Sequence, residues 1–214
     1  MKKLFFILLF LAALTSCDEK PDTTGVSEEI RNRKIRKISD ADILSGAEVK
    51  GLKIVLFSQK KITMNVENAF NREGLAKAME YCSLKNNPWI DSLEKAEFVK
   101  LRRVSLHPRN PENLPDSTER VLLEAYEYNV KNKISRNSHT PEIGDRTILF
   151  TAPILIENSC LKCHGIKGKD IKDTDYKLIQ EKYPQDQAAN YRLEELVGMW
   201  SVVIDKKEFI RRMK

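Results

Sequence analysis

The chain has 214 residues, of which 41% are hydrophobic, 7% aromatic and 32% charged. This composition excludes collagen-like chains, disulfide-dense miniproteins and polytopic membrane proteins, and it leaves enough apolar sequence for a globular core. The net charge of +6 is only mildly basic. Because no basic cluster with interleaved aromatic residues occurs outside Arg31–Lys37, we expect no nucleic acid partner.

The first residues predict an export signal with a lipid attachment site. A short positive segment, Met1–Lys3, precedes an apolar run of eleven residues, Leu4–Leu14, which is too short to span a bilayer as a helix. Leu14-Thr15-Ser16-Cys17 resembles the lipobox of bacterial lipoproteins, in which the cysteine becomes the acylated N-terminus. We therefore expect a signal peptide over 1–16, lipidation of Cys17 and a membrane-anchored location on the periplasmic side. The alternative is a plain cleaved signal peptide, with Cys17 as an incidental thiol.

Polar and charged residues over 17–39 predict a tether between the lipid and a folded domain at 40–214. Within this tether, Arg31–Lys37 fits either contact with anionic lipid head groups or a solvated helical face, and we favour the second. From Asp40 to Leu84 apolar residues recur at helical spacing. Ser39 or Asp40 is the expected N-cap, and Gly74 is the expected break between two helices.

The pattern changes beyond Pro88. Ala96–Leu106 has a partly alternating pattern that predicts a strand, and Pro108–Pro115 predicts a loop. Asp116 or Ser117 then caps a helix. Two more strands are expected, one at 145–156 with an interruption at Pro153 and one at 197–204. A short helix is expected between them, at 173–183. Helices followed by strands interleaved with helices predict an α+β domain with an antiparallel sheet.

Cys160-Leu161-Lys162-Cys163-His164 has the Cys-x-x-Cys-His spacing of covalent haem attachment. Two thiols three residues apart reach the two vinyl groups of one haem, and the adjacent imidazole of His164 falls on the iron. A zinc site with Cys82 as the fourth ligand is a rival, although zinc sites usually pair two short-spaced ligand couples. A thioredoxin-like redox pair is a second rival interpretation, although the sequence predicts no βαβ unit around the motif. We expect one covalently bound haem c.

Cys82 is the thiol that these assignments leave without a covalent role. It is either an inert core residue on the apolar face of Ala78 and Met79 or a ligand of the iron opposite His164. Other side chains that can ligate haem iron are also present: His107, His139, Met64, Met79 and Met199. His107 lies in a proline-rich loop and His139 precedes Pro141, so both histidines are expected at the surface.

Four segments together resemble one known family: Ala78–Cys82, Arg103–Pro115, Glu157–Gly165 and Tyr183–Ala188. The family is that of exported single-haem c-type proteins with a PAS-like haem sensor domain, and the resemblance covers about 43–204. It implies a PAS-like antiparallel sheet flanked by helices, with the N-terminal helices packing over the haem. It also implies His164 and Cys82 as the two axial ligands. One departure is visible, because the family tends to have Gly-Tyr-x-x-Gly-Asp where this chain has Asn190–Glu195.

Arg103 and Arg109, together with Arg102 and Asn110, fit two roles. Their side chains can hold the haem propionates, or they can form structural ion pairs below the proline-rich loop.

No catalytic or nucleotide-binding motif occurs, and we expect a protein that is not an enzyme. The favoured function is a sensor of redox state or of a small molecule. In this function Cys82 is the iron ligand whose bond changes, and a partner protein receives the signal. The alternative is a single-haem cytochrome for extracytoplasmic electron transfer. A peroxidase-like enzyme with an open iron is a weaker third reading. Thiolate ligation lowers the potential of haem iron, whereas electron carriers more often use His and Met ligands, so the sensor is preferred.

Overall fold

The computed structural model describes Gly25 and residues 38–140, 142–143 and 145–213. The expected signal peptide over 1–16, the lipidation site Cys17 and the basic run Arg31–Lys37 lie outside the described residues. In the described part of the chain, no helix has the length and apolar character that a bilayer crossing requires. Ser39–Lys214 forms one unit, and the description below concerns this unit.

Two helices form the N-terminal part of this unit, α2 (Asp40–Glu73) and α3 (Leu75–Cys82). The Ser39 hydroxyl accepts a hydrogen bond from the Asp42 amide, and the Asp42 carboxylate accepts one from the Ser39 amide. This capping box satisfies two amides at the start of α2. Gly74 ends α2 and begins α3 with a φ of 85°, a conformation that favours glycine. The expected break at Gly74 is therefore confirmed.

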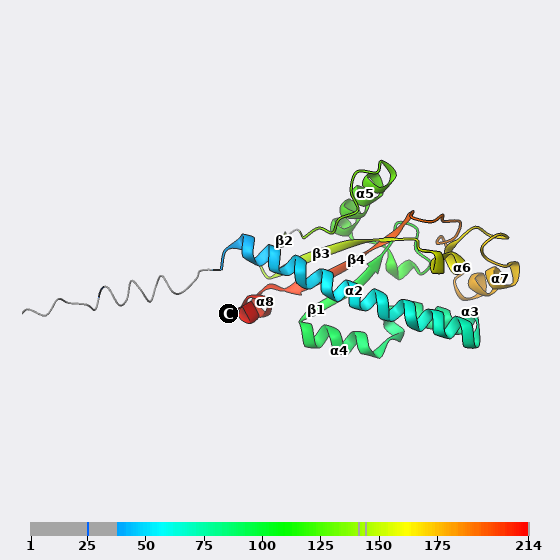
Figure 1. The fold of residues 1–214 in the computed structure, drawn as a ribbon, viewed down its shortest axis with the longest axis horizontal. Coiled ribbons are helices and arrows are strands. Elements are labelled where there is room, and N and C mark those ends of the chain that lie inside the picture. Colours follow the sequence, from blue (N-terminus) through cyan, green and yellow to red (C-terminus); the bar gives the residue numbers. More distant parts are fainter. Residues whose placement is uncertain (1–24, 26–37, 141, 144, 214) are drawn as a thin grey trace, which may run out of the picture. The chain divides into compact units, whose positions relative to one another are not determined.

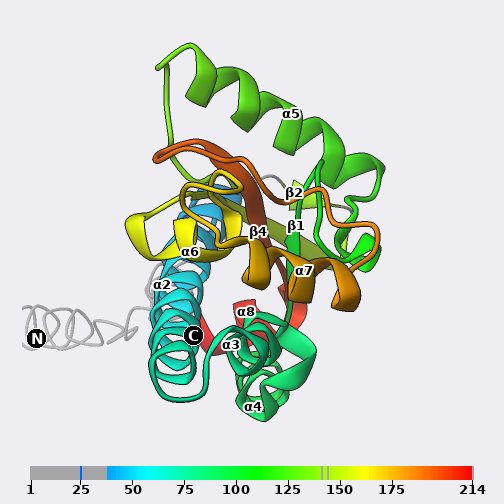
Figure 2. The same ribbon diagram turned by 90° about the vertical axis from the view of Figure 1, so that its right-hand side faces the viewer.

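A four-stranded antiparallel sheet has the order β1-β4-β3-β2. Its strands are β1 (Val99–Val104), β2 (Glu142–Ile143), β3 (Thr147–Leu155) and β4 (Leu196–Asp205). Helices α2 and α5 (Ser117–Lys131) cover opposite faces of this sheet (Figures 1 and 2). The expected α+β class, an antiparallel sheet flanked by helices, is confirmed.

The face of the sheet under α2 is built from alternate residues of the strands. Trp200 of β4 donates its indole N–H to the Gln59 side-chain oxygen of α2 at 3.1 Å. Gly51 allows α2 to approach β3 closely, because a Cβ atom at this position would overlap the ring of Phe150. Side chains alternate across a strand, so the neighbours of these residues point to the other face.

The face of the sheet under α5 is a closed apolar core. It contains Val104 and Met199 from the sheet and Leu123 and Tyr126 from α5, all of them buried. The Asp116 carboxylate caps α5 by accepting a hydrogen bond from the Glu119 amide at 2.8 Å, as the sequence predicted.

Two helices were not predicted, α4 (Pro88–Glu97) and α8 (Lys206–Met213). From the sequence, the helical region is expected to end before Pro88. In the structure this proline occupies the first turn of α4, where its missing N–H has no helical partner in any case. The helix α7 (Asp173–Lys182) agrees with the short helix expected at 173–183.

The strand β3 continues through Pro153, where an interruption was predicted. Thr151 exchanges both of its backbone hydrogen bonds with His139, on the side of β3 that faces away from β4. Pro153 lies two residues further along the strand, so its nitrogen faces the same side. No ladder bond to β4 is lost there, and the proline is tolerated.

Candidate functional site

The six cofactor-binding residues suggested by the sequence meet at one cleft. The cleft has a volume of about 720 Å³ including its mouth, and a wider hollow of about 1400 Å³ adjoins it. The six residues all line the cleft: Cys82, Arg103, Arg109, Cys160, Cys163 and His164. Four of them also line the wider hollow, which makes the two spaces parts of one depression.

Helices α2 and α3 supply one wall of the cleft. Gln59, Ile62, Thr63 and Val66 of α2 line it at the spacing of a single helical face. Ala78, Met79 and Cys82 contribute the neighbouring surface from α3. The N-terminal helices therefore cover the site, as the family resemblance implied.

The Cys-x-x-Cys-His motif lies on a single helical turn, formed by the 3-10 turn Asn158–Cys160 and by α6 (Leu161–His164). Residues at positions i, i+3 and i+4 of such a turn share one side, which brings Cys160, Cys163 and His164 to the cleft. Gly165 follows directly. A Cβ atom at this position would lie 2.6 Å from the Leu161 carbonyl oxygen and from the Asp170 Cβ, so the turn requires glycine.

His164 is held in one tautomer. Its Nδ1 lies 2.7 Å from the Ala188 carbonyl oxygen, and because a carbonyl only accepts, Nδ1 carries the proton and Nε2 keeps its lone pair. The pKa of His164 is lowered to about 4, mainly because the ring is desolvated and secondly because the positive charge of Arg109 is near. The imidazole is therefore neutral near pH 7, which is the state that ligates a metal.

The two motif cysteines are protonated thiols at neutral pH. Desolvation raises the pKa of both, and that of Cys163 rises to about 11. A thioredoxin-like redox pair needs a lowered thiol pKa, so these values argue against that alternative. Within the described residues, no group of three His, Cys, Asp or Glu side chains is arranged to hold a metal ion. The zinc alternative therefore gains no support from the geometry.

Cys82 is the last residue of α3 and a free thiol. Its carbonyl oxygen accepts a hydrogen bond from Arg103 Nη2, and a cation is favourable at this end of a helix. The guanidinium of Arg103 lies 5.5 Å from the centre of the Trp200 ring. Arg103 thus joins the end of α3 to the sheet and fixes the backbone that carries the Cys82 thiol.

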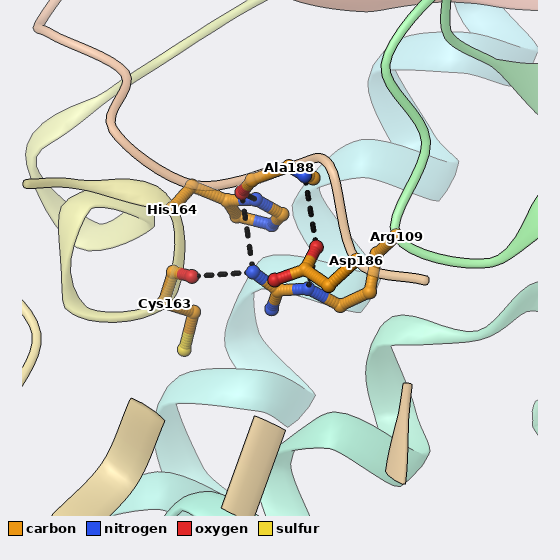
Figure 3. A network of polar contacts seen from close by, with 5 residues as sticks. All are labelled: Arg109, Cys163, His164, Asp186 and Ala188. Atoms are coloured by element: carbon orange, nitrogen blue, oxygen red, sulfur yellow. Dashed lines mark hydrogen bonds and ion pairs between the residues drawn. The ribbon is translucent and has the colours of Figure 1, made fainter. Parts of the chain in front are cut away.

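Arg109 belongs to a set of five residues that we call the Arg109 network: Arg109, Cys163, His164, Asp186 and Ala188 (Figure 3). Arg109 Nη2 donates to the carbonyl oxygens of Cys163 at 2.6 Å and Ala188 at 3.1 Å. Its Nε donates to Asp186 Oδ1 at 3.2 Å. Arg109 therefore contacts the backbone of the Cys-x-x-Cys-His motif, in addition to lining the cleft.

The other two polar residues considered for the propionates have structural partners. Arg102 donates to Glu119 at 2.8 Å and to the Leu114 carbonyl oxygen at 3.0 Å. The Asn110 side chain accepts a hydrogen bond from the Glu112 amide at the start of the 3-10 turn Pro111–Asn113.

Most of the alternative iron ligands lie away from the cleft. Met199 is buried under α5, Met64 is exposed, and His139 is exposed beside β3. His107 is also exposed and lines only the wider hollow. Met79 remains beside Cys82 at the cleft itself.

The segment before β4, where this chain departs from the family pattern, contains two residues in a left-handed conformation. Asn190 and Glu194 occupy the two positions where that pattern has glycine, and they have φ values of 69° and 67°. The amides of Asn190 and Tyr191 donate to the carbonyl oxygens of Gly165 and His164, both at 2.9 Å. The segment therefore holds the motif in place with non-glycine residues in a left-handed conformation.

Sequence reasoning assigned no role to Asp186 and Ala188, which hold Arg109 and His164. Both lie in the segment Tyr183–Ala188 that contributed to the family resemblance, and this was the available signal. Their partners are distant in sequence, since Arg109 precedes Ala188 by 79 residues.

The fold and the cleft define an α+β protein that holds a Cys-x-x-Cys-His site between a long helix and an antiparallel sheet. The family model for Tll0287-like proteins (Tll0287) matches residues 26–205. This match covers most of the chain, which therefore belongs to the Tll0287-like family, and the family resemblance is confirmed.

Among solved structures, the crystal structure of the cyanobacterial heme-protein Tll0287 is similar, with a TM-score of 0.50 and 21% identity. The match covers 73% of this chain and 95% of that chain, and at this identity it supports the fold. The search of curated proteins gave no match.

Proposed function

We propose that the chain binds one haem c, attached by thioether bonds from Cys160 and Cys163, with His164 as an axial ligand of the iron. The observation that carries this proposal is the neutral His164 imidazole, held through Nδ1 by a carbonyl beside the two motif thiols at a cleft. The similarity to a structure described as a heme-protein supports the same cofactor.

The residues at the cleft fit this cofactor. Apolar side chains such as Ile62 and Val66 form one wall, and the sulfur and nitrogen ligands gather at another part. Arg103 and Arg109 both line the cleft and the wider hollow, so we assign both to the propionates. Arg103 is the better candidate, because within the described residues only its Nη2 binds a protein carbonyl, whereas both Nε and Nη2 of Arg109 bind protein groups.

Cys82 is the proposed second axial ligand, and the proposed role is redox or small-ligand sensing. Cys82 and His164 line both parts of the depression, and Arg103 holds the backbone of Cys82. The bound haem would supply one-electron redox chemistry, at a potential that a thiolate ligand lowers. Bound and released Cys82 are the two states that a sensor needs. A partner protein would receive the output.

The proposal also includes an exported lipoprotein anchored through Cys17 on the periplasmic side, with no enzymatic activity. Its support is the sequence of residues 1–17. Fractionation of cells that produce Cys17→Ser tests this part. We expect the variant to leave the membrane fraction or to retain its signal peptide. Normal cleavage with an unchanged membrane fraction would instead indicate a different mode of retention.

Covalent attachment is tested by producing the full chain in cells that have the c-type haem maturation system. We expect the mass of the chain to increase by one haem and the red colour to resist acid–acetone extraction. The double variant Cys160→Ala/Cys163→Ala should lose both properties, whereas Cys82→Ala should keep them. Extractable haem in the wild-type chain, or zinc in its place, contradicts the proposal.

The sensor role depends on Cys82, and spectra of Cys82→Ala test it. We expect the variant to keep its covalent haem, to become high-spin or water-ligated and to bind CO. An unchanged spectrum and potential would show that another residue, such as Met79 at the same cleft, ligates the iron. Electron transfer would then be the better function.

A further inference from the structure

The Ala188 carbonyl oxygen accepts two hydrogen bonds at the cleft. One comes from His164 Nδ1 at 2.7 Å and the other from Arg109 Nη2 at 3.1 Å (Figure 3). The same short segment contains Asp186, whose Oδ1 accepts from Arg109 Nε at 3.2 Å and from the Ala188 amide at 2.8 Å. The proposed iron ligand is therefore connected to a buried ion pair through a single peptide group.

This ion pair lies largely out of water. The side chain of Arg109 is 13% exposed and that of Asp186 is 2% exposed. The second carboxylate oxygen of Asp186 is buried and has no hydrogen-bond partner among the described residues. Charges in such surroundings are poorly screened, so each acts on neighbouring groups more strongly than a surface charge does.

The shared carbonyl makes the two charges act on His164 as well. A metal-bound histidine whose other N–H is hydrogen-bonded to a carbonyl is a more basic ligand, and such a bond fixes its ring. A guanidinium on the same carbonyl oxygen draws electron density away from it, which weakens the bond to His164. Asp186 opposes this effect by neutralising part of the charge of Arg109.

We propose that Arg109 and Asp186 are positioning residues that set the reduction potential of the bound haem through the Ala188 carbonyl, Arg109 raising it and Asp186 lowering it. This inference rests on the proposed function, because it requires His164 on the iron. Arg109 favours the reduced iron, which carries one positive charge less, and it makes His164 a weaker electron donor. Both effects have the same sign.

Potentiometric titration of the full haem-loaded chain and of two charge-neutral variants tests the inference. At the midpoint potential of the wild type, we expect the ratio of reduced to oxidised haem to fall on the order of tenfold in Arg109→Gln and to rise on the order of tenfold in Asp186→Asn. A purely structural pair would not produce shifts of opposite sign.

The pair Arg211–Glu208 on α8 provides matched controls, because it has the same charges at an N–O distance of 2.7 Å and its side chains are more accessible to water, at 64% and 24% exposed. Arg211→Gln and Glu208→Gln should change the ratio by less than about twofold, since solvent screens exposed charges. Arg109→Lys keeps the charge and loses the forked geometry. We expect its shift to be smaller than that of Arg109→Gln.

Shifts of the same sign in Arg109→Gln and Asp186→Asn, or shifts no larger than those of the controls, would overturn the inference. Asp186→Asn keeps Oδ1 as an acceptor for Arg109 and Ala188, so it decides the matter alone if Arg109→Gln does not accumulate. Haem content by mass distinguishes the two proposals. A wild-type chain without haem refutes the proposed function, whereas haem-loaded variants with unshifted potentials refute only the role of the pair.

Discussion

Two arginine–carboxylate pairs lie on the two sides of one sheet and have different roles. Arg102 and Glu119 pair at 2.8 Å on the side of α5, and Arg109 and Asp186 pair at 3.2 Å at the cleft. Both carboxylates are almost completely buried, with side chains 4% and 2% exposed. By burial and chemistry alone, the two pairs look alike.

The difference lies in what else each pair touches. Glu119 accepts a hydrogen bond from the Asp116 amide at 3.0 Å, and Arg102 donates one to the Leu114 carbonyl oxygen. These bonds join β1 to the start of α5. The Arg109 pair reaches His164 through Ala188. A buried ion pair is therefore weak guidance to function by itself, and the groups at the far end of its hydrogen bonds decide its role.

The largest effect that separates the two sides is the pH dependence of stability caused by His164. Its pKa is about 4 in the folded chain, against an ordinary value of 6.5, so the unfolded chain binds the proton first as the pH falls. We expect the haem-free chain to lose up to about 3 kcal/mol of unfolding free energy as the pH falls from 6.5 to 4. Urea titrations at several pH values measure this loss. His164→Gln should lack this component, and an identical slope in that variant would assign the loss to other groups.

Close packing of α2 should have the next largest effect. Gly51→Ala places a methyl group against the Phe150 ring, and such overpacking costs about 2–3 kcal/mol. Gly46→Ala in the same helix is the matched control, since its Cβ would meet only the outer ends of Phe209 and Met213 at 3.1 and 3.3 Å. Thermal unfolding should show a large loss for the first variant and a change within about 1 kcal/mol for the second. Equal losses would contradict the close approach at Gly51.

On the side of α5, removal of a buried hydroxyl should affect stability alone. Tyr126 donates its hydroxyl to the Thr151 carbonyl oxygen at 3.1 Å, and Tyr126→Phe should cost about 1 kcal/mol. The haem spectrum and the potential should remain those of the wild type, because Tyr126 packs away from the cleft. A shifted potential in this variant would mean that the two sides of the sheet are coupled.

The smallest effect should be a gain in stability at the strained turn before β4. Glu194→Gly removes the cost of a left-handed glutamate with a φ of 67°, and we expect a net gain of about 0.5–1 kcal/mol after the entropy of glycine is counted. Lys133→Gly tests the same change on the other side, just beyond the end of α5, where φ is 56°. Denaturant midpoints of the two variants should rise by similar amounts. A loss at Glu194 alone would indicate that its ion pair with Arg136, at 3.1 Å, contributes more to stability than the strain costs.

Local signals predicted the features that depend on neighbouring residues. The N-caps at Ser39 and Asp116, each of them one of two candidates, and the break at Gly74 each involve residues only a few positions apart. The Cys-x-x-Cys-His motif is equally local, and a single helical turn brings its three side chains to the cleft. The identities of these residues alone were sufficient to expect a covalent cofactor.

Features that depend on distant partners were not predictable. Nothing near Asp186 in the sequence indicates that it pairs with Arg109, which lies 77 residues earlier. The sequence does not decide whether Arg109 binds a haem propionate or forms a structural ion pair, because both roles use the same guanidinium geometry. The helix α4 was missed for a different reason, since its first residue, Pro88, fits the start of a helix as well as a break.

The sequence separations in the Arg109 network have a consequence for the order in which the molecule folds. The motif turn closes within five residues, whereas the bonds of Arg109 to Cys163 and Ala188 close loops of 54 and 79 residues. Because long loops cost more entropy to close, these bonds form late. Pulse-labelled hydrogen exchange during refolding should therefore protect the α2 amides before that of Gln187, which donates to the distant Pro108 carbonyl oxygen at 3.2 Å. Arg109 also binds the Ala188 carbonyl that orients His164, so the final position of this carbonyl is fixed late, and a cofactor that reaches the motif earlier meets a histidine that this carbonyl does not yet hold.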